Sequence, residues 1–229
     1  SMGGYGASSY VGTSEEFTTS ANIITAAAWA SGGAINTARR AVGGCGLQDA
    51  ALIAGGEVSG VVADTEEYNG TSWSEQNNLS TARQALSGFG IQTSAVFCGG
   101  NPSSSQTNAT EEYNGSSFSG GGNLNTARQA GATAGIETAG VVFGGYANPP
   151  DSAITNTEEY NGSAWSNNPN GLSTARYQFS ACGTQTAALA FGGYPNSSPY
   201  GSNATEEYDG SSFSSGGNLP QGIYGNVSS

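Results

Sequence analysis

The sequence predicts an all-β protein, a β-propeller of five four-stranded blades with one blade shared between the two ends of the chain. A unit beginning "TAR" recurs at Thr37, Thr81, Thr126 and Thr174, so its copies are spaced 44, 45 and 48 residues apart. That period is typical of four-stranded propeller blades rather than of helical or leucine-rich repeats. The chain also has 37 Gly among 229 residues, as expected for short strands joined by tight turns.

The second copy shows how each unit divides into four strands. We expect strands over 83–90 and 93–100, a third that opens the stretch 109–115, and a fourth over 116–122. The third and fourth strands are separated by Asn-Gly, or Asp-Gly in the last copy. This dipeptide is a strong hairpin signal, and we expect both of its residues to have positive φ.

Four complete units and two partial ends make up a single predicted domain, residues 1–229. The units are 37–80, 81–125, 126–173 and 174–219. Residues 1–36 supply the second half of a further unit, and residues 220–229 match its first strand. Joining the two ends in one closing blade would leave the ring without a free edge.

Landmarks within each unit resemble those of the kelch repeat. In the second copy they are the double glycine Gly99-Gly100, then Tyr113, then Phe118, and the other copies have Trp or Phe at the last position. The resemblance implies a propeller whose first strand lies nearest the axis. We expect Trp29, Trp73 and Trp165 to pack between blades.

One arginine and one pair of glutamates recur in every complete unit. Neighbouring side chains on a strand point to opposite faces, so one glutamate of each pair is free to meet the arginine of its own or of the next blade in a bidentate, partly buried clamp. A catalytic carboxylate pair is the alternative, but adjacent strand residues diverge and cannot flank one bond. The predicted clamp residues are Arg39, Arg83, Arg128, Arg176, Glu66, Glu67, Glu111, Glu112, Glu158, Glu159, Glu206 and Glu207.

Charge and composition exclude several functions. The formal net charge is −12 and the chain has no His. Nucleic acid is therefore an unfavourable partner, and a Ser-His-Asp triad or a His-bound metal site is excluded. No apolar run reaches the roughly 20 residues that cross a bilayer, so we expect no membrane insertion. We expect no enzyme activity, no catalytic residues, no cofactor and no metal.

Three cysteines occupy apolar positions of the repeat. Cys45 and Cys182 stand where other copies have Phe89 and Ala134, and Cys98 stands where they have Ala or Phe. We expect all three to be buried thiols rather than metal ligands or a disulfide pair.

Function is expected where the copies differ, between the double glycine and the glutamate pair. These loops contain the candidate binding residues Tyr5, Tyr10, Tyr146, Tyr194, Tyr200 and Asn101. Tyrosine and asparagine without cations suit a protein surface or a neutral glycan. The alternative that these are merely tolerated loops stays open.

The amino-acid sequence of the third copy, residues 123–163, is also similar to repeat arrays in structural and tail-associated proteins of marine bacteriophages. That resemblance implies a virion or cell-surface adhesion part within a longer chain. The first hypothesis is thus a non-catalytic binding or scaffold module. A lectin that uses the variable loops is the second, and a sugar-modifying enzyme, with Glu57, Asp64 and Asp151 as its scattered loop carboxylates, is the third. The oligomeric state is not predicted.

Overall fold

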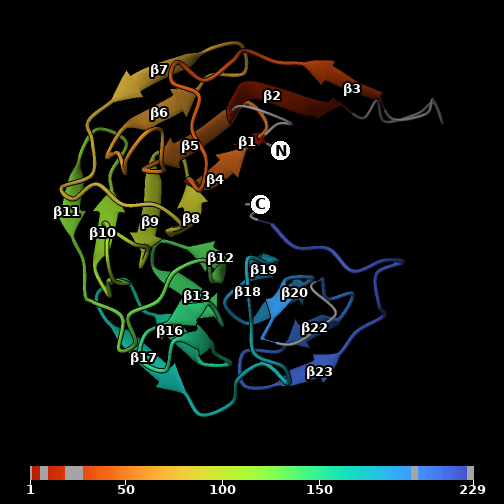
Figure 1. Ribbon diagram of the computed structural model, residues 1–229. Helices are drawn as coiled ribbons and strands as arrows, with labels where there is room; N and C mark the ends of the chain where they lie inside the picture. Colours follow the sequence, from red (N-terminus) through yellow and green to blue (C-terminus); the bar gives the residue numbers. More distant parts are fainter. Residues whose placement is uncertain (1, 6–9, 19–27, 197–200, 226–229) are drawn as a thin grey trace.

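The computed structural model describes residues 2–5, 10–18, 28–196 and 201–225, with side chains described from residue 31 onward. Every element within these ranges is a β-strand. Four antiparallel four-stranded sheets, called blades 1 to 4 here, stand around a common centre, and each has its first strand innermost (Figure 1). The predicted all-β propeller arrangement is therefore confirmed.

Within each blade the strands follow one another from the centre outward in chain order. Blade 1 contains β4 (Gly43–Leu47), β5 (Ala50–Ala54), β6 (Thr65–Tyr68) and β7 (Trp73–Gln76). Blade 2 contains β8 (Ser87–Ile91), β9 (Ser94–Cys98), β10 (Thr110–Tyr113) and β11 (Phe118–Gly120). Blade 3 contains β12 (Ala132–Ile136), β13 (Ala139–Phe143), β16 (Thr157–Tyr160) and β17 (Trp165–Asn168). Blade 4 contains β19 (Ser180–Thr184), β20 (Ala187–Phe191), β22 (Thr205–Tyr208) and β23 (Phe213–Ser215).

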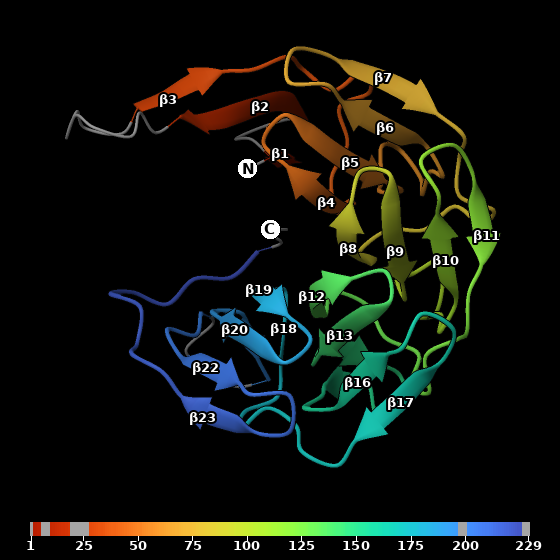
Figure 2. The same ribbon diagram turned by 180° about the vertical axis from the view of Figure 1, so that it is seen from behind.

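The prediction of five four-stranded blades is wrong, because the described residues form four. The N-terminal strands β1 (Met2–Tyr5), β2 (Tyr10–Thr18) and β3 (Ala28–Ser31) form a three-stranded sheet that lies beside blade 1 in the ring (Figure 2). Its register places Phe17 opposite Trp29, as Tyr68 is placed opposite Trp73 in blade 1.

The C-terminal segment, expected to supply a strand to this N-terminal sheet, bonds to blade 4 as far as it is described. Ile223 accepts a hydrogen bond from Gly193 N–H and donates one to Ser202, and Gly225 N–H donates to Gln178. In every blade the inner strand begins four residues after the clamp arginine, as Arg176 and Ser180 show. Ile223 occupies the arginine position, so the corresponding strand would begin in residues 226–229, which lie outside the described part of the chain.

The inner strand begins later than the sequence predicts because one residue of each connector is left-handed. Ala85 has φ 52°, which interrupts the expected strand over 83–90, and β8 begins at Ser87. Ala41, Ala130 and Gln178 take the same conformation at the matching positions. This conformation costs roughly 1–2 kcal/mol for a residue with a side chain. The amides of Ala85, Ala130 and Gln178 each donate to the carbonyl at the matching position of the preceding copy, as Ala85 donates to Ala41 at 2.7 Å, so a chain of backbone bonds links the connectors.

The hairpin between the third and fourth strands has a four-residue loop rather than a two-residue turn. Tyr68 pairs with Trp73. Asn69 N–H donates to Ser72, and the Asn69 side-chain oxygen accepts from Thr71 and Ser72 N–H. Only Gly70 has positive φ, so the expectation of positive φ at both residues is wrong. Asp209 replaces the asparagine in blade 4, and hydrogen bonds from Ser212 and Ser211 lower its pKa to about 2.

Apolar side chains fill the interfaces between neighbouring blades. Leu52 of blade 1 packs with Phe97 and Tyr113 of blade 2, while Phe89 of blade 2 packs with Trp165 of blade 3. Strand alternation sends successive residues of each second strand to opposite interfaces. The core is therefore a series of layers between sheets.

Small residues are required where blades approach closely. A Cβ on Gly140 would lie 2.0 Å from the Phe89 ring across the interface between blades 2 and 3. At the double glycine of blade 2, Gly99 has φ 65° and a Cβ added there would clash with the Arg128 carbonyl oxygen. The glycines of the repeat thus allow each blade to contact the next connector.

Candidate functional site

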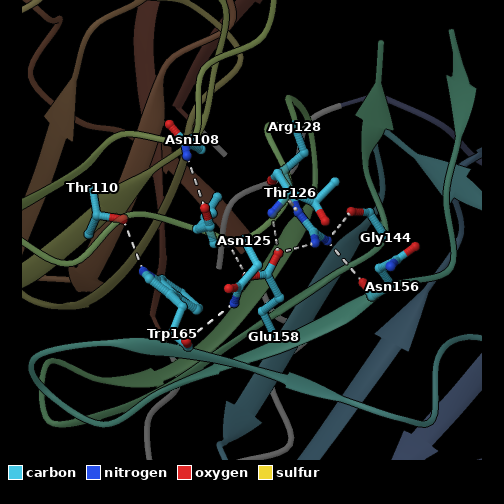
Figure 3. Close-up of polar contacts among 10 residues, drawn as sticks. Asn108, Thr110, Asn125, Thr126, Arg128, Gly144, Asn156, Glu158 and Trp165 are labelled. Carbon is cyan, nitrogen blue, oxygen red and sulfur yellow. Dashed lines mark hydrogen bonds and ion pairs between the residues drawn. The ribbon is translucent and has the colours of Figure 1, made fainter. Parts of the chain in front are cut away.

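The first glutamate of each pair forms a buried ion pair with the arginine of the connector that enters the same blade. In blade 3, Arg128 Nη2 lies 2.5 Å from Glu158 Oε1, and Nη1 donates to the carbonyls of Gly144 at 2.7 Å and Asn156 at 2.9 Å (Figure 3). The other blades repeat the pair as Arg39–Glu66 at 2.6 Å, Arg83–Glu111 at 3.0 Å and Arg176–Glu206 at 2.9 Å.

The second oxygen of the same glutamate holds the start of the connector. Glu158 Oε2 accepts from both the backbone N–H and the side-chain amide of Asn125, three residues before Arg128 (Figure 3). Glu111 Oε2 accepts from Ser80 N–H in the corresponding place of blade 2. Burial lowers the pKa of Arg128, and the nearby Glu158 carboxylate opposes that shift.

The second glutamate of each pair has a different partner, the tyrosine of the next blade. Tyr113 Oη donates to Glu67 Oε1 at 3.0 Å, from blade 2 to blade 1. Tyr160 donates to Glu112 and Tyr208 to Glu159 in the same way. Burial, followed by the bond to the carboxylate, raises the pKa of each tyrosine. One glutamate therefore fixes the connector and the other fixes the neighbouring blade, while Glu207 of blade 4 is exposed.

Further side chains fasten the interfaces. Gln92 Nε2 in blade 2 donates to the carbonyls of Ala51 and Tyr68 in blade 1, and Gln185 repeats this contact from blade 4 to blade 3. Trp165 Nε1 donates to Thr110 Oγ1 of blade 2 at 2.9 Å (Figure 3). The residues that recur in the blades therefore form bonds within a blade or between neighbouring blades.

The cysteines differ from the prediction at one position. Cys45 and Cys98 are buried, and burial raises the pKa of each thiol to about 12. Cys182 is exposed, so the prediction that it is buried is wrong. The matching Cys45 packs against blade 2, whereas Cys182 lies on the face of blade 4 that no further four-stranded blade covers.

The variable loops and the connectors meet at one end of the blades, called the loop face. Two positions alternate there: the residue after the clamp arginine and the residue after the double glycine. Backbone bridges pair Arg40 with Glu57, Gln84 with Asn101, Gln129 with Tyr146 and Tyr177 with Tyr194. The pairs are linked in turn, because the second glycine of blades 1 to 3 donates its N–H to the next clamp-arginine carbonyl, as Gly100 does to Arg128. We call these eight residues and Tyr224 the connector row.

The row changes from charged and amide side chains to aromatic ones. Arg40 and Glu57 form a surface ion pair of 2.8 Å in blade 1. The aromatic part contains Tyr146, Tyr177, Tyr194 and Tyr224. Its successive ring centroids are 5.3, 5.2 and 5.6 Å apart.

The candidate binding residues are only partly brought together. Tyr146 and Tyr194 lie in the aromatic part, and Asn101 lies in the amide part on blade 2. Tyr5 and Tyr10 are backbone partners in the β1–β2 pair, but their side chains lie outside the description, as does all of Tyr200.

Tyr177 and Tyr224 were missed by the sequence reasoning, because both lie outside the loops between the double glycine and the glutamate pair. A signal for Tyr177 was present, since the residue after the clamp arginine varies among Arg, Gln and Tyr. Applying the same rule of variation to the connectors would have found it.

The loop carboxylates have separate partners. Glu57 pairs with Arg40, Asp64 accepts from Asn78, and the Asp151 carboxylate accepts from Tyr146 Oη at 2.6 Å. That bond raises the pKa of Tyr146. In the described part of the chain, no group of three or more His, Cys, Asp or Glu side chains is placed to hold a metal ion.

No protein-family model matches the chain, and no curated protein matches it. The described residues include no helix long and apolar enough to span a membrane. The propeller arrangement and the geometry of its loop face are therefore the basis for a functional proposal.

Proposed function

We propose that the protein is a non-catalytic binding or scaffold module that contacts its partner through the loop face. One observation carries this proposal. The residues repeated in every blade are engaged in holding the blades together, while the connector row differs from blade to blade. A rigid frame that presents variable side chains on one face is typical of binding proteins.

The proposed absence of catalysis is supported by the state of the carboxylates. The first glutamates are buried in ion pairs, and the second ones of blades 1 to 3 accept from tyrosine hydroxyls. General acid–base catalysis by two carboxylates needs both groups beside the same substrate bond. Glu57, Asp64 and Asp151 each bond to a different partner, which supports a non-catalytic role.

The finer assignments rest on resemblance. The double glycine, the tyrosine and the later aromatic residue of each unit favour a kelch-type propeller. The amino-acid sequence of the repeat favours a part of a virion or a surface adhesin. Detecting this chain by mass spectrometry in purified virus particles would support the second assignment. Its absence from particles that contain all other structural proteins would contradict it.

The proposed function is tested with fluorescently labelled protein on glycan and protein arrays. One variant changes the loop face, combining Gln84→Ala, Asn101→Ala and Tyr194→Ala. Its matched control changes the opposite face, combining Leu47→Ser, Ile91→Ser and Ile136→Ser at three exposed positions. We expect the loop-face variant to lose the hits and the control to keep them. Loss in the control alone, or chemical conversion of a bound compound, would overturn the proposal.

A further inference from the structure

The aromatic part of the connector row has properties of a ligand platform. Tyr146 and Tyr177 come from blade 3 and the connector that enters blade 4, whereas Tyr194 and Tyr224 come from blade 4 and the C-terminal segment. Four rings from separate segments thus form one continuous series. Tyr224, at the end of this series, is 59% exposed, and the other three tyrosines are partly exposed.

Backbone bonds fix the segments that carry the rings. Tyr146 exchanges both backbone bonds with Gln129. Gly225 N–H donates to Gln178, which anchors the segment on the far side of Tyr224. The loop after Tyr146 is also joined to the loop after Tyr194, since Asn196 accepts from Ala153 N–H at 2.8 Å and donates to its carbonyl at 3.2 Å. A platform held in this way loses little conformational entropy when it binds.

The same bonds disfavour an extended peptide as the ligand. A peptide that adds a strand needs unpaired backbone groups along an edge. Here Tyr177 pairs with Tyr194, and Ile223 is bonded on both its amide and its carbonyl side. The polar side chains at the row include the amides of Gln84, Asn101 and Gln129, and the Asp151 carboxylate lies beside it, accepting from Tyr146 and Asn148.

Charge disfavours an anionic ligand. Four of the five arginines are buried in clamp ion pairs, and the fifth, Arg40, is paired with Glu57. A phosphate, sulfate or carboxylate would therefore find no uncommitted cation, on a protein with a formal net charge of −12.

We propose that Tyr146, Tyr177, Tyr194 and Tyr224 form a binding site for a neutral oligosaccharide. A pyranose ring has an apolar face of C–H groups that packs on tyrosine, and a rim of hydroxyls that exchange hydrogen bonds with amides and a carboxylate. Asp151, oriented by Tyr146, is placed to accept from a sugar hydroxyl. This inference rests on the proposed function and names the ligand class of the same face.

The test uses isothermal titration and saturation-transfer NMR with the intact chain. The probes are unbranched neutral oligosaccharides of gluco, galacto, manno and fuco configuration, with a sialylated oligosaccharide for comparison. We expect at least one neutral probe to bind, with an affinity that does not change between low and high salt. We expect Tyr146→Ala and Tyr224→Ala each to weaken it by about three- to tenfold.

Two controls separate binding from folding. Ile91→Ala changes a 47% exposed side chain on the opposite face and should leave the affinity unchanged. Tyr224→Phe keeps the ring and should retain most of the affinity, with thermal unfolding unchanged for both Tyr224 variants.

The outcomes distinguish this inference from the proposed function. Failure of every neutral probe to bind at millimolar concentration, or equal binding by the tyrosine variants, would overturn the oligosaccharide site. A protein hit on the arrays that depends on the loop face would then leave the proposed function standing with a different ligand.

Discussion

At the scale of single residues, the exchange of tryptophan for phenylalanine explains two unusual buried hydroxyls. Trp165 Nε1 donates to Thr110 Oγ1 of the preceding blade. Phe213 occupies the tryptophan position of blade 4 and has no donor. The corresponding hydroxyl of blade 3, Thr157 Oγ1, is buried without a hydrogen-bond partner among the described residues. Phe118 and Thr65 show the same relation between blades 2 and 1.

This relation predicts that Phe213→Trp stabilises the protein. The Tyr208–Phe213 and Tyr160–Trp165 ring pairs have similar geometry, with centroids 4.8 and 4.9 Å apart, so an indole fits the same orientation. Phe213 also borders a hollow of about 270 Å³. One new buried hydrogen bond is worth about 1 kcal/mol in the free energy of unfolding, measured by urea denaturation.

Thr157→Val supplies the control for this prediction. Without the hydroxyl, the gain from Phe213→Trp should fall to the packing contribution alone, which a double-mutant cycle measures. An equal gain in both backgrounds would show that the indole does not bond to Thr157.

Residue positions also show what the sequence could and could not predict. The repeat located the strands, because "TEEY" and the double glycine recur with the period of a blade. The left-handed Ala85 was not predictable from its type, since alanine rarely takes positive φ, and the backbone bond to Ala41 accompanies it. Cys182 was aligned with buried residues, but burial depends on a neighbouring blade and not on the repeat itself.

At the scale of elements, the glutamate pair joins three segments that propensity alone would leave separate. Glu158 bonds to the connector that enters blade 3, and Glu159 accepts from Tyr208 of blade 4. The opposite directions of adjacent side chains on a strand make this division possible. The motif was predictable as a clamp, whereas its tyrosine half was not, because pairing across blades depends on their distance.

Arg128→Met is expected to lower the free energy of unfolding by about 3–5 kcal/mol, since it leaves Glu158 buried without its cation. Two carbonyls, of Gly144 and Asn156, lose their donor as well. Arg40→Met is the matched control. Arg40 is 45% exposed in its pair with Glu57, so its loss should cost no more than about 1 kcal/mol. Equal small losses from both variants, measured by urea unfolding, would contradict a structural role for the buried clamp.

At the scale of the whole molecule, the described residues form a series of four four-stranded blades, with no fifth four-stranded blade among them. The three interfaces between blades 1 to 4 share the tyrosine–glutamate bond, and the described part of blade 4 ends the series with Glu207 and Cys182 exposed. In repeat proteins, stability is approximately a sum over units and interfaces. Groups that recur at the interfaces should therefore act together on the stability of the whole chain.

The pH dependence of stability follows from these interface groups. Burial raises the pKa of Cys45 and Cys98 from 9.0 to about 12 and also raises that of Tyr113, Tyr160 and Tyr208 above 10.0. At a pH between the ordinary and the raised pKa of such a group, the group keeps its proton in the folded state and has released it in the unfolded state. The stabilisation from these groups is complete below about pH 9 and is lost as the pH rises toward 12.

We therefore expect the free energy of unfolding to fall steeply above about pH 9, in a series of urea titrations from pH 7 to 11. The absence of His removes one source of change between pH 6 and 8. Tyr160→Phe tests the origin of the fall, because it removes one of the raised hydroxyls while keeping the ring between blades 2 and 3. Its stability should be lower at pH 7, where the bond to Glu112 is lost, and should decline less between pH 9 and 11. A parallel decline in both proteins would assign the alkaline loss to other groups, and a flat profile up to pH 11 would contradict the buried state of the thiols and tyrosines.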